Sequence, residues 1–156
     1  LRTLMLANVS AGEVAISKGA VALASVVCVS TACFFIAGGA PALLPAHLVL
    51  TVLGSVPIIL VSLVLGLASR DQMTAGFYSV PVLLVALVPS FSVVNKTIQT
   101  VAAVTPLGGV YNLLGLAADG TLFTPEALMP LAITLAWIVA GSTAFAALYR
   151  RLARDN

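Results

Sequence analysis

Charged residues are scarce in this chain: only 8% of its 156 residues are Asp, Glu, Lys or Arg, while 61% are hydrophobic. A soluble domain of this size cannot bury so large an apolar share, so the composition excludes an ordinary water-soluble protein. The net charge of +2 is small and dispersed, which argues against a basic surface for nucleic acid. The expected partner is therefore the lipid bilayer, with no nucleic acid.

Cysteine and histidine are scarce as well, with two cysteines and one histidine. Cys28 and Cys33 lie in one apolar run, about 140° apart around a helix. We interpret them as small core residues rather than as a disulfide or a metal pair. His47 has no second ligand at metal-binding spacing, so we expect it to be a solvated loop residue and predict no metal site.

Ionisable residues are absent from the middle of every long apolar stretch. Such residues cost about 2.5–3.5 kcal/mol at the bilayer centre and usually mark ion or proton paths. Serine and threonine are frequent, but no G-x-S-x-G nucleophile motif or base partner accompanies them. We therefore predict no catalytic residue and do not expect the chain to be an enzyme.

Four apolar stretches are each long enough to cross a bilayer, which takes roughly 20 helical residues. Lipid offers no hydrogen bonds to the backbone, so a span must be a helix or part of a closed barrel. The apolar runs lack two-residue alternation, which excludes the barrel. The sequence predicts an all-α membrane protein with transmembrane helices at 14–38, 48–68, 74–94 and 126–149.

Two further segments have a different character. Residues 97–125 are broken by a Pro-Leu-Gly-Gly sequence at 106–109, and we predict two short helices that form an outer re-entrant segment. Thr124 is the predicted N-cap of the last span, with Pro125 at its first helical position. Residues 1–10 suit a short helix at the membrane surface, and Ser10 to Glu13 fits an S-x-x-E capping box.

The basic residues predict the orientation. If the four spans alternate, six of the seven Lys and Arg residues fall on one side, which is then cytoplasmic: Arg2, Lys18, Arg70, Arg150, Arg151 and Arg154. Both ends of this chain are then cytoplasmic, in a multi-pass protein of the cell membrane. Lys96 lies on the other side with Asn95 and Gln99. This polar group is either a helix end among lipid headgroups or the outer part of a translocation pathway.

The opening residues resemble a stretch that precedes the third membrane helix in permeases of ABC-2 type exporters. The matching positions are Arg2, Thr3, Leu4, Leu6, Val9, Ser10, Glu13 and Lys18. Asn8 stands where the family usually has proline, and Met5 where it often has glutamate. The segment Val104 to Leu107, with Tyr111 and Leu114, is similar to a segment between the family's fifth and sixth helices. The four spans would then correspond to helices three to six, and two helices are expected upstream.

The resemblance implies the permease subunit of an ATP-binding cassette exporter. It would pair with a second permease copy, as a homodimer or pseudo-dimer, and with an ATP-binding cassette ATPase subunit that holds ATP and Mg; no cofactor is expected in this chain. In the family, a short cytoplasmic coupling helix docks on the ATPase. By resemblance this role falls to Arg2, Thr3, Leu4, Met5, Leu6, Asn8, Val9, Ser10 and Glu13.

Other functions stay open. An ion-gradient-driven secondary transporter or channel would use broken helices around a central site, and Pro57 and Pro81 are consistent with kinks, although the two halves show no repeat. A membrane-embedded enzyme or assembly factor would need polar groups at membrane depth. Residues 1–10 could also be a plain interfacial helix that contacts only lipid headgroups.

Overall fold

The computed structural model describes residues 11–69, 71–92 and 95–154, and within them every regular element is a helix. Four segments are long and apolar enough to cross a membrane. They are α2 (Ala11–Ile36), α3 (Leu44–Ala68), α4 (Gln72–Leu87) continued by the 3-10 helix η2 (Val88–Phe91), and η3 (Pro125–Ala127) followed by α7 (Leu128–Arg154). The prediction of an all-helical fold with four helices able to span a membrane is confirmed, and such helices suit a multi-pass membrane protein.

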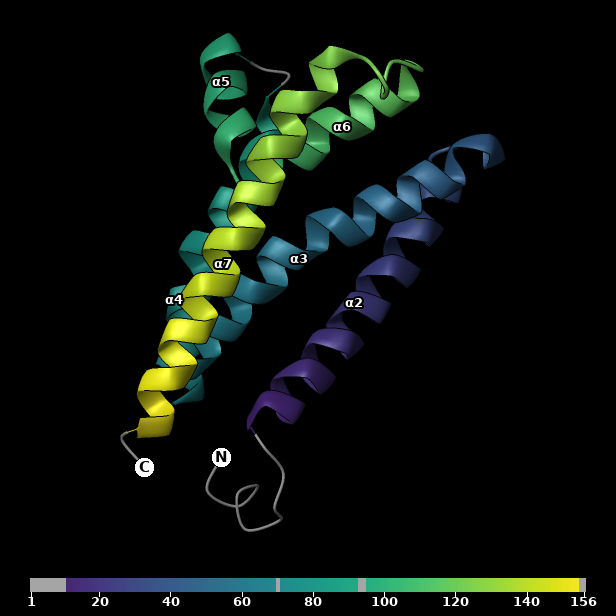
Figure 1. The fold of residues 1–156 in the computed structure, drawn as a ribbon. Coiled ribbons are helices and arrows are strands. Elements are labelled where there is room, and N and C mark those ends of the chain that lie inside the picture. The colour runs from purple at the N-terminus through teal and green to yellow at the C-terminus, as the bar shows by residue number, and fades with distance from the viewer. Residues whose placement is uncertain (1–10, 70, 93–94, 155–156) are drawn as a thin grey trace.

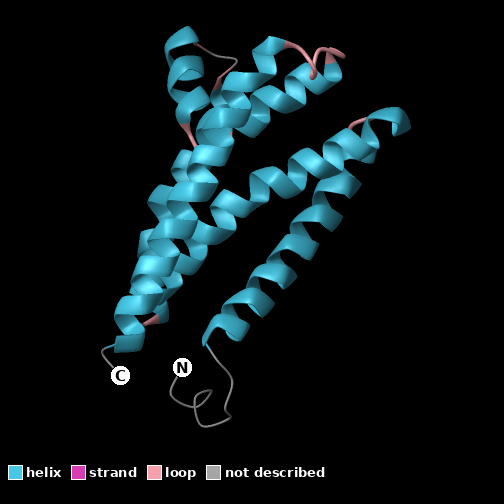
Figure 2. Cartoon of the chain, viewed as in Figure 1, coloured by secondary structure: helices cyan, strands magenta, loops and turns pink. Residues whose placement is uncertain are grey.

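The long helices run between two ends of the molecule (Figure 1). At one end, here the inner end, α2 and α4 begin and α3 and α7 finish. The opposite, outer end carries the α2–α3 connection and two short helices, α5 (Lys96–Val104) and α6 (Gly108–Ala118). Figure 2 shows that the described connections are short loops between helices.

The prediction of two short helices before the last span is also confirmed. α5 and α6 are bent by 110° relative to each other. Both lie at the outer end, so the chain leaves α4 and enters α7 there without another crossing (Figure 1). We call α5 and α6 the outer helix pair.

Helix α3 is the centre of the packing, since it contacts α2, α4, α6 and α7. The buried apolar residues gather where α3 meets α6, in a cluster of Leu50, Val110, Leu113 and Ala117. Gly54 allows the close approach there, because a Cβ at this position would lie 2.8 Å from Val110. Gly141 of α7 does the same against Leu60, at 3.0 Å. Small residues at these crossings are the usual means of close helix packing in membranes.

The connection between α2 and α3 is shorter than predicted. The predicted spans leave residues 39–47 between them, but Pro41 opens the 3-10 helix η1 (Pro41–Leu43) and Pro45 lies in the first turn of α3. Proline is tolerated in a first turn because its missing N–H would have no intrahelical partner there. The prediction of His47 as a solvated loop residue is therefore wrong: it is a half-buried residue of α3.

The two cysteines are free, and both are exposed on α2. The interpretation of Cys28 and Cys33 as core residues is therefore wrong. The reason is that α2 packs chiefly against α3 and leaves most of its circumference uncovered. In a bilayer an apolar exposed residue faces lipid at no cost, so hydrophobicity alone did not distinguish core from surface.

The N-cap of the last span differs in one detail. Thr124 does occupy the cap position with Pro125 after it, at the start of η3 rather than of α7. Its hydroxyl does not accept from the helix, but donates to the Thr121 carbonyl at 2.8 Å. Thr124 thus stabilises the preceding turn rather than the helix N-terminus.

Asp71 starts α4 after the tight turn from α3. Its Oδ1 accepts a hydrogen bond from the Thr74 backbone N–H at 2.7 Å, which is the N-cap geometry. This bond, with a further one from the Thr74 hydroxyl, lowers the pKa of Asp71 below its ordinary value of 3.8. The ionised form is thus the one that stabilises the helix start.

We expect Asp71→Ala to lower the stability of the α3–α4 hairpin at neutral pH. The contribution of Asp71 is complete above the unfolded-state pKa and is lost as the pH falls through the lowered folded-state pKa, so the wild-type and Ala variants should converge in acid. Thermal unfolding in detergent between neutral and acidic pH measures this. Asp71→Asn is the control, because its amide oxygen can cap without titrating; a gap between wild type and Ala that is independent of pH would contradict the assignment.

Candidate functional site

The outer helix pair is closed at its bend by its own hydrogen bonds. Thr105 is buried, and its Oγ1 donates to the Ala102 carbonyl at 2.7 Å and accepts from the Gly108 N–H at 3.1 Å. The Thr105 carbonyl also accepts from the Gly108 N–H, at 3.0 Å. Broken backbone at membrane depth is tolerated only where protein groups satisfy it. Thr105 supplies those groups at the bend.

Helix α6 is wedged against α7 through a glycine. A Cβ on Gly109 would collide with the Pro130 carbonyl and with Oγ1 of Thr134. Thr134 has no exposed surface, and its hydroxyl donates to the Pro130 carbonyl at 2.9 Å. The close contact of Gly109 with this turn of α7 fixes where α6 enters the bundle.

Helix α5 is tied to α7 by a tryptophan. The indole Nε1 of Trp137 donates to the Val104 carbonyl at 2.9 Å. Val104 is the last residue of α5, where carbonyls have no partner within their own helix. Through Trp137 and Gly109, both arms of the outer helix pair are attached to the last span.

The predicted outer pathway residues lie together at the start of α5. Asn95 is the N-cap, with its side chain accepting from the Thr97 N–H at 2.9 Å, and Lys96 and Gln99 follow in the first turn. All three side chains are exposed. Behind them an apolar hollow of about 320 Å³ lies between η2 and α5, lined by Val88, Phe91, Thr97, Ile98 and Val101. The arrangement places a polar rim beside an apolar hollow, and the role of the rim in transport stays a prediction.

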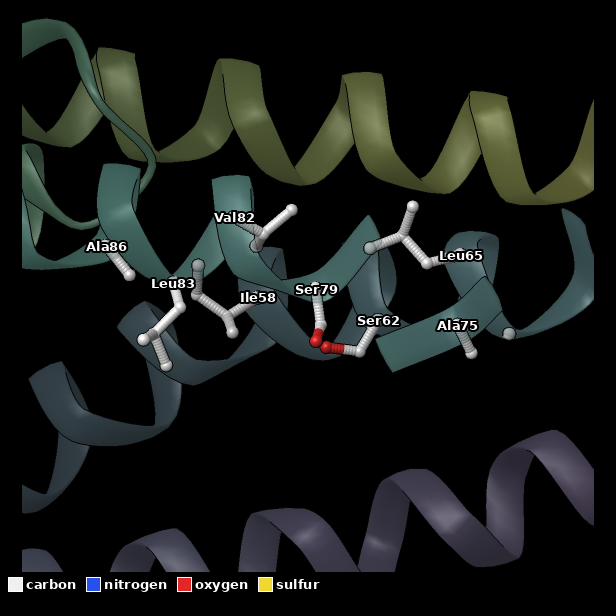
Figure 3. A pocket seen from close by; sticks show the side chains of 9 residues that line it. Ile58, Ser62, Leu65, Ala75, Ser79, Val82, Leu83 and Ala86 are labelled. Atoms are coloured by element: carbon white, nitrogen blue, oxygen red, sulfur yellow. The ribbon is translucent and has the colours of Figure 1, made fainter. Parts of the chain in front are cut away.

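A groove of about 360 Å³ lies between α3 and α4, along the two candidate membrane-spanning helices. Its walls are aliphatic except for Ser62 of α3 and Ser79 of α4, whose hydroxyls point toward one another in Figure 3. The Ser79 hydroxyl donates to the Gly76 carbonyl at 2.7 Å. The groove offers an apolar surface with one polar spot and no ionisable lining residue.

A polar cluster that sequence reasoning missed joins α2 to α3. Ser30 Oγ lies 2.9 Å from His47 Nε2 and 3.1 Å from Thr51 Oγ1, and Thr51 Oγ1 lies 3.5 Å from His47 Nε2. The ring of Phe34 packs against the imidazole, with 4.6 Å between the ring centroids and a tilt of 32° between the ring planes. The available signal was the four-residue spacing of His47 and Thr51, which places both on one face of a helix. We call these four residues the α2–α3 polar cluster.

The geometry of the cluster favours a contact between two helices over a nucleophile and its general base. A separation of 2.9 Å between Ser30 and His47 would suit a nucleophile and its general base. However, Ser30 lies inside α2, where neighbouring backbone N–H groups are used by the helix and cannot stabilise an oxyanion. The Ser30 hydroxyl is also shared with Thr51. What the arrangement can do is hold two helices together.

The predicted ATPase-coupling residues lie mostly outside the described residues. Only Glu13 is described, as an exposed residue in the first turn of α2. The others are Arg2, Thr3, Leu4, Met5, Leu6, Asn8, Val9 and Ser10. The described helix α2 begins directly after them, at the inner end.

Within the described residues, no group of three or more His, Cys, Asp or Glu side chains could hold a metal ion. Comparison with protein-family models, curated proteins and solved structures gives no match. The functional interpretation of the chain therefore depends on its residues and geometry.

Proposed function

We propose that this chain is the membrane-spanning permease subunit of an ABC-2 type ATP-binding cassette exporter in the cytoplasmic membrane. A partner ATPase subunit binds ATP and Mg and hydrolyses the nucleotide, and a second permease copy completes the transport pathway. The chain itself contributes spans and coupling contacts and no catalytic residue.

The observation that carries the proposal is the outer helix pair inserted between the third and last spans. The pair is bent by 110° and attached to α7 through Trp137 and Gly109. Its sequence, including Thr105 and Pro106, is where the resemblance to the segment between the family's last two helices lies. The resemblance of residues 2–18 to the family's coupling region supports the same assignment independently.

The charge distribution supports an external energy source. No Asp, Glu, Lys or Arg lies between Gly19 and Ser69 or between Ala127 and Tyr149, so these spans hold no carboxylate or ammonium relay. Proton- and ion-coupled transporters ordinarily place such groups at membrane depth. An exporter driven by ATP hydrolysis in a soluble partner subunit does not require such groups within its spans.

The distribution of basic residues supports a cytoplasmic position for the proposed coupling residues. Six of the seven basic residues fall on the inner side, which the positive-inside rule assigns to the cytoplasm. Helix α2, which follows the opening segment in the sequence, begins at the inner end. A closing ATPase there could tilt α2 as a rigid body.

A secondary transporter driven by an ion gradient is the alternative. Pro57 inside α3, Pro81 inside α4 and the break between α5 and α6 are the features that favour it. Transport by the purified protein in liposomes, without ATP or an ATPase, would support this alternative and contradict the exporter.

We predict that Leu4→Glu combined with Leu6→Glu breaks the association with the ATPase. Burying a leucine contributes about 1.5–3 kcal/mol, and about 1.4 kcal/mol corresponds to a tenfold change in affinity. Co-purification of the ATP-binding subunit, and ATP hydrolysis by the purified complex, should therefore fall at least about tenfold.

The matched control is Ala153→Glu, which adds a carboxylate in the last turn of α7, also at the inner end but outside the coupling segment. This variant should keep its ATPase. If the double leucine variant bound and stimulated the ATPase as well as the control does, residues 1–10 would have no coupling role.

A further inference from the structure

Helix α5 runs inward from the outer tip of the molecule (Figure 1). Its last residue, Val104, accepts the hydrogen bond of Trp137, which lies about 13 Å along α7 from Leu128, at a rise of about 1.5 Å per residue. The nine residues of α5 are themselves about 13 Å long. One leaflet of hydrocarbon is about 15 Å thick, so α5 matches the depth of the outer leaflet.

The exposed residues of α5 change from polar to apolar along its axis. Asn95, Lys96 and Gln99 are exposed at its outer start. Val101 and Val104, nearer its inner end, have exposed fractions of 56% and 61%. A bilayer changes in the same direction, from polar headgroups to acyl chains. The exposed side of α5 therefore suits contact with a lipid whose headgroup lies at the outer end.

The hollow between η2 and α5 lies at the depth of this leaflet. Helix η2 is the outer end of the third candidate span, Met73–Phe91. The hollow holds about 320 Å³, and Thr97 is the one polar residue that lines it. Phe91, on the η2 side, has an exposed fraction of 56%. Such walls favour a hydrocarbon chain, because a polar group would lose its hydration there.

The charge beside the hollow favours an anion. Lys96 directly precedes Thr97, and it is the only Lys or Arg between Arg70 and Arg150. Residues 72–118 contain no Asp or Glu, so the sequence around this lysine supplies no carboxylate to neutralise it. A lysine at a membrane interface lays its apolar stem along hydrocarbon and keeps its amine among the headgroups, where it attracts anionic lipids.

We propose that η2 and α5 form a binding site for one anionic phospholipid of the outer leaflet. An acyl chain fills the hollow along Phe91, Ile98 and Val101, and the headgroup phosphate pairs with the Lys96 amine. The lipid then lies parallel to α5 with its headgroup outward, as it does in the bilayer. Binding of this lipid does not depend on the proposed exporter function.

Native mass spectrometry of the full-length protein in detergent tests the site. The protein is given equal amounts of phosphatidylglycerol and phosphatidylcholine with the same acyl chains. We expect one phosphatidylglycerol to bind about fivefold more tightly than phosphatidylcholine, which is the contribution of one basic residue near anionic headgroups. Glycerol phosphate, which has the same charged group without acyl chains, should not displace it.

Two pairs of variants separate the charge from the hollow. Lys96→Gln should make the two affinities equal, whereas Lys18→Gln, which removes the same charge from an exposed residue of α2, should keep the preference. Val101→Phe fills part of the hollow and should weaken both lipids about fourfold, the equivalent of about one buried methylene. Val104→Phe is its control, because this exposed valine does not line the hollow.

Equal affinities in the wild-type protein would overturn the lipid site, and so would a preference that Lys18→Gln abolishes as fully as Lys96→Gln. Unchanged lipid binding in Val101→Phe would overturn the position of the acyl chain. Displacement by glycerol phosphate would show a site for a free anion instead of a lipid. No ATPase takes part in these measurements, so their outcome is separate from that of the coupling experiment on Leu4 and Leu6.

Discussion

Gly109→Ala is expected to be among the most destabilising single substitutions in this chain, although it adds one methyl group. The new Cβ would overlap the Pro130 carbonyl and the Thr134 hydroxyl. Neither group can move aside easily. The Pro130 carbonyl belongs to the backbone of α7, and the fully buried Thr134 side chain donates a hydrogen bond to that carbonyl. The substitution must therefore push α6 away from α7.

Overpacking of this kind costs about 1–3 kcal/mol. Equilibrium unfolding of the protein in mixed micelles measures the loss, and the indole of Trp137, the single tryptophan, reports whether its bond to Val104 persists. We expect the wavelength of the Trp137 emission maximum to change in the variant, together with the loss of stability. Moving α6 also disturbs α5, whose Val104 carbonyl accepts the hydrogen bond from the indole.

Gly115→Ala is the matched control within the same helix. A Cβ at Gly115 meets no atom within 4 Å, so the methyl group is free of collisions and alanine is the better helix former by about 1 kcal/mol. This variant should be at least as stable as the wild type. Equal losses at Gly109 and Gly115 would show that α6 is not wedged against α7.

The four spans were predictable because lipid imposes a simple rule on the sequence. Each needs a long apolar run, and the breaks at Gly38, Asp71 and Thr124 mark where the runs stop. The bounds were less accurate: 48–68 was expected for the second span, whereas α3 begins at Leu44 because Pro45 fits a helical first turn. A proline marks a helix start or a loop equally well in the sequence alone.

The polar cluster at Ser30 and His47 could not be predicted, because it depends on which helices become neighbours. Four-residue spacing put His47 and Thr51 on one face of α3, but the partner face on α2 follows only from the tight turn at Gly38 and Gly39. The exposed Cys28 and Cys33 were missed for the same reason. Apolar pattern gives the segments that enter lipid, while packing decides which side of each segment meets protein.

The glycine contacts of the outer helix pair belong to the same class. Pro106 and Gly108 signalled a break, and the two short helices were predicted from it. That Gly109 meets Thr134 and Pro130 required the position of α7, which lies more than twenty residues further along the chain. Local sequence determines where a helix breaks, and the position of α7 determines which residues the broken segment contacts.

A second prediction with an all-or-none outcome concerns the side of the membrane on which each segment lies. Six of the seven basic residues fall on one side of a four-span arrangement, and positive residues near span ends are retained in the cytoplasm. Residues at the start of the chain and after α7 should then face the cytoplasm. Gln99 and Asp119, exposed on the outer helix pair, should face outward.

Single-cysteine variants allow this to be read directly. Thr3→Cys and Arg154→Cys report the two ends of the chain, and Gln99→Cys reports the outer helix pair, each in a background with Cys28 and Cys33 replaced by alanine. A maleimide that cannot cross membranes is applied to right-side-out and to inside-out vesicles. Each cysteine is labelled in both vesicle preparations, so a cysteine that reacts in one preparation and not in the other is shown to be reactive and to face one side only.

The label on Thr3→Cys tests the account most directly, since coupling to a cytoplasmic ATPase requires this segment to be on the cytoplasmic side. The exporter account predicts labelling of Thr3→Cys and Arg154→Cys in inside-out vesicles only, and of Gln99→Cys in right-side-out vesicles only. Labelling of Thr3→Cys from outside the cell would contradict it.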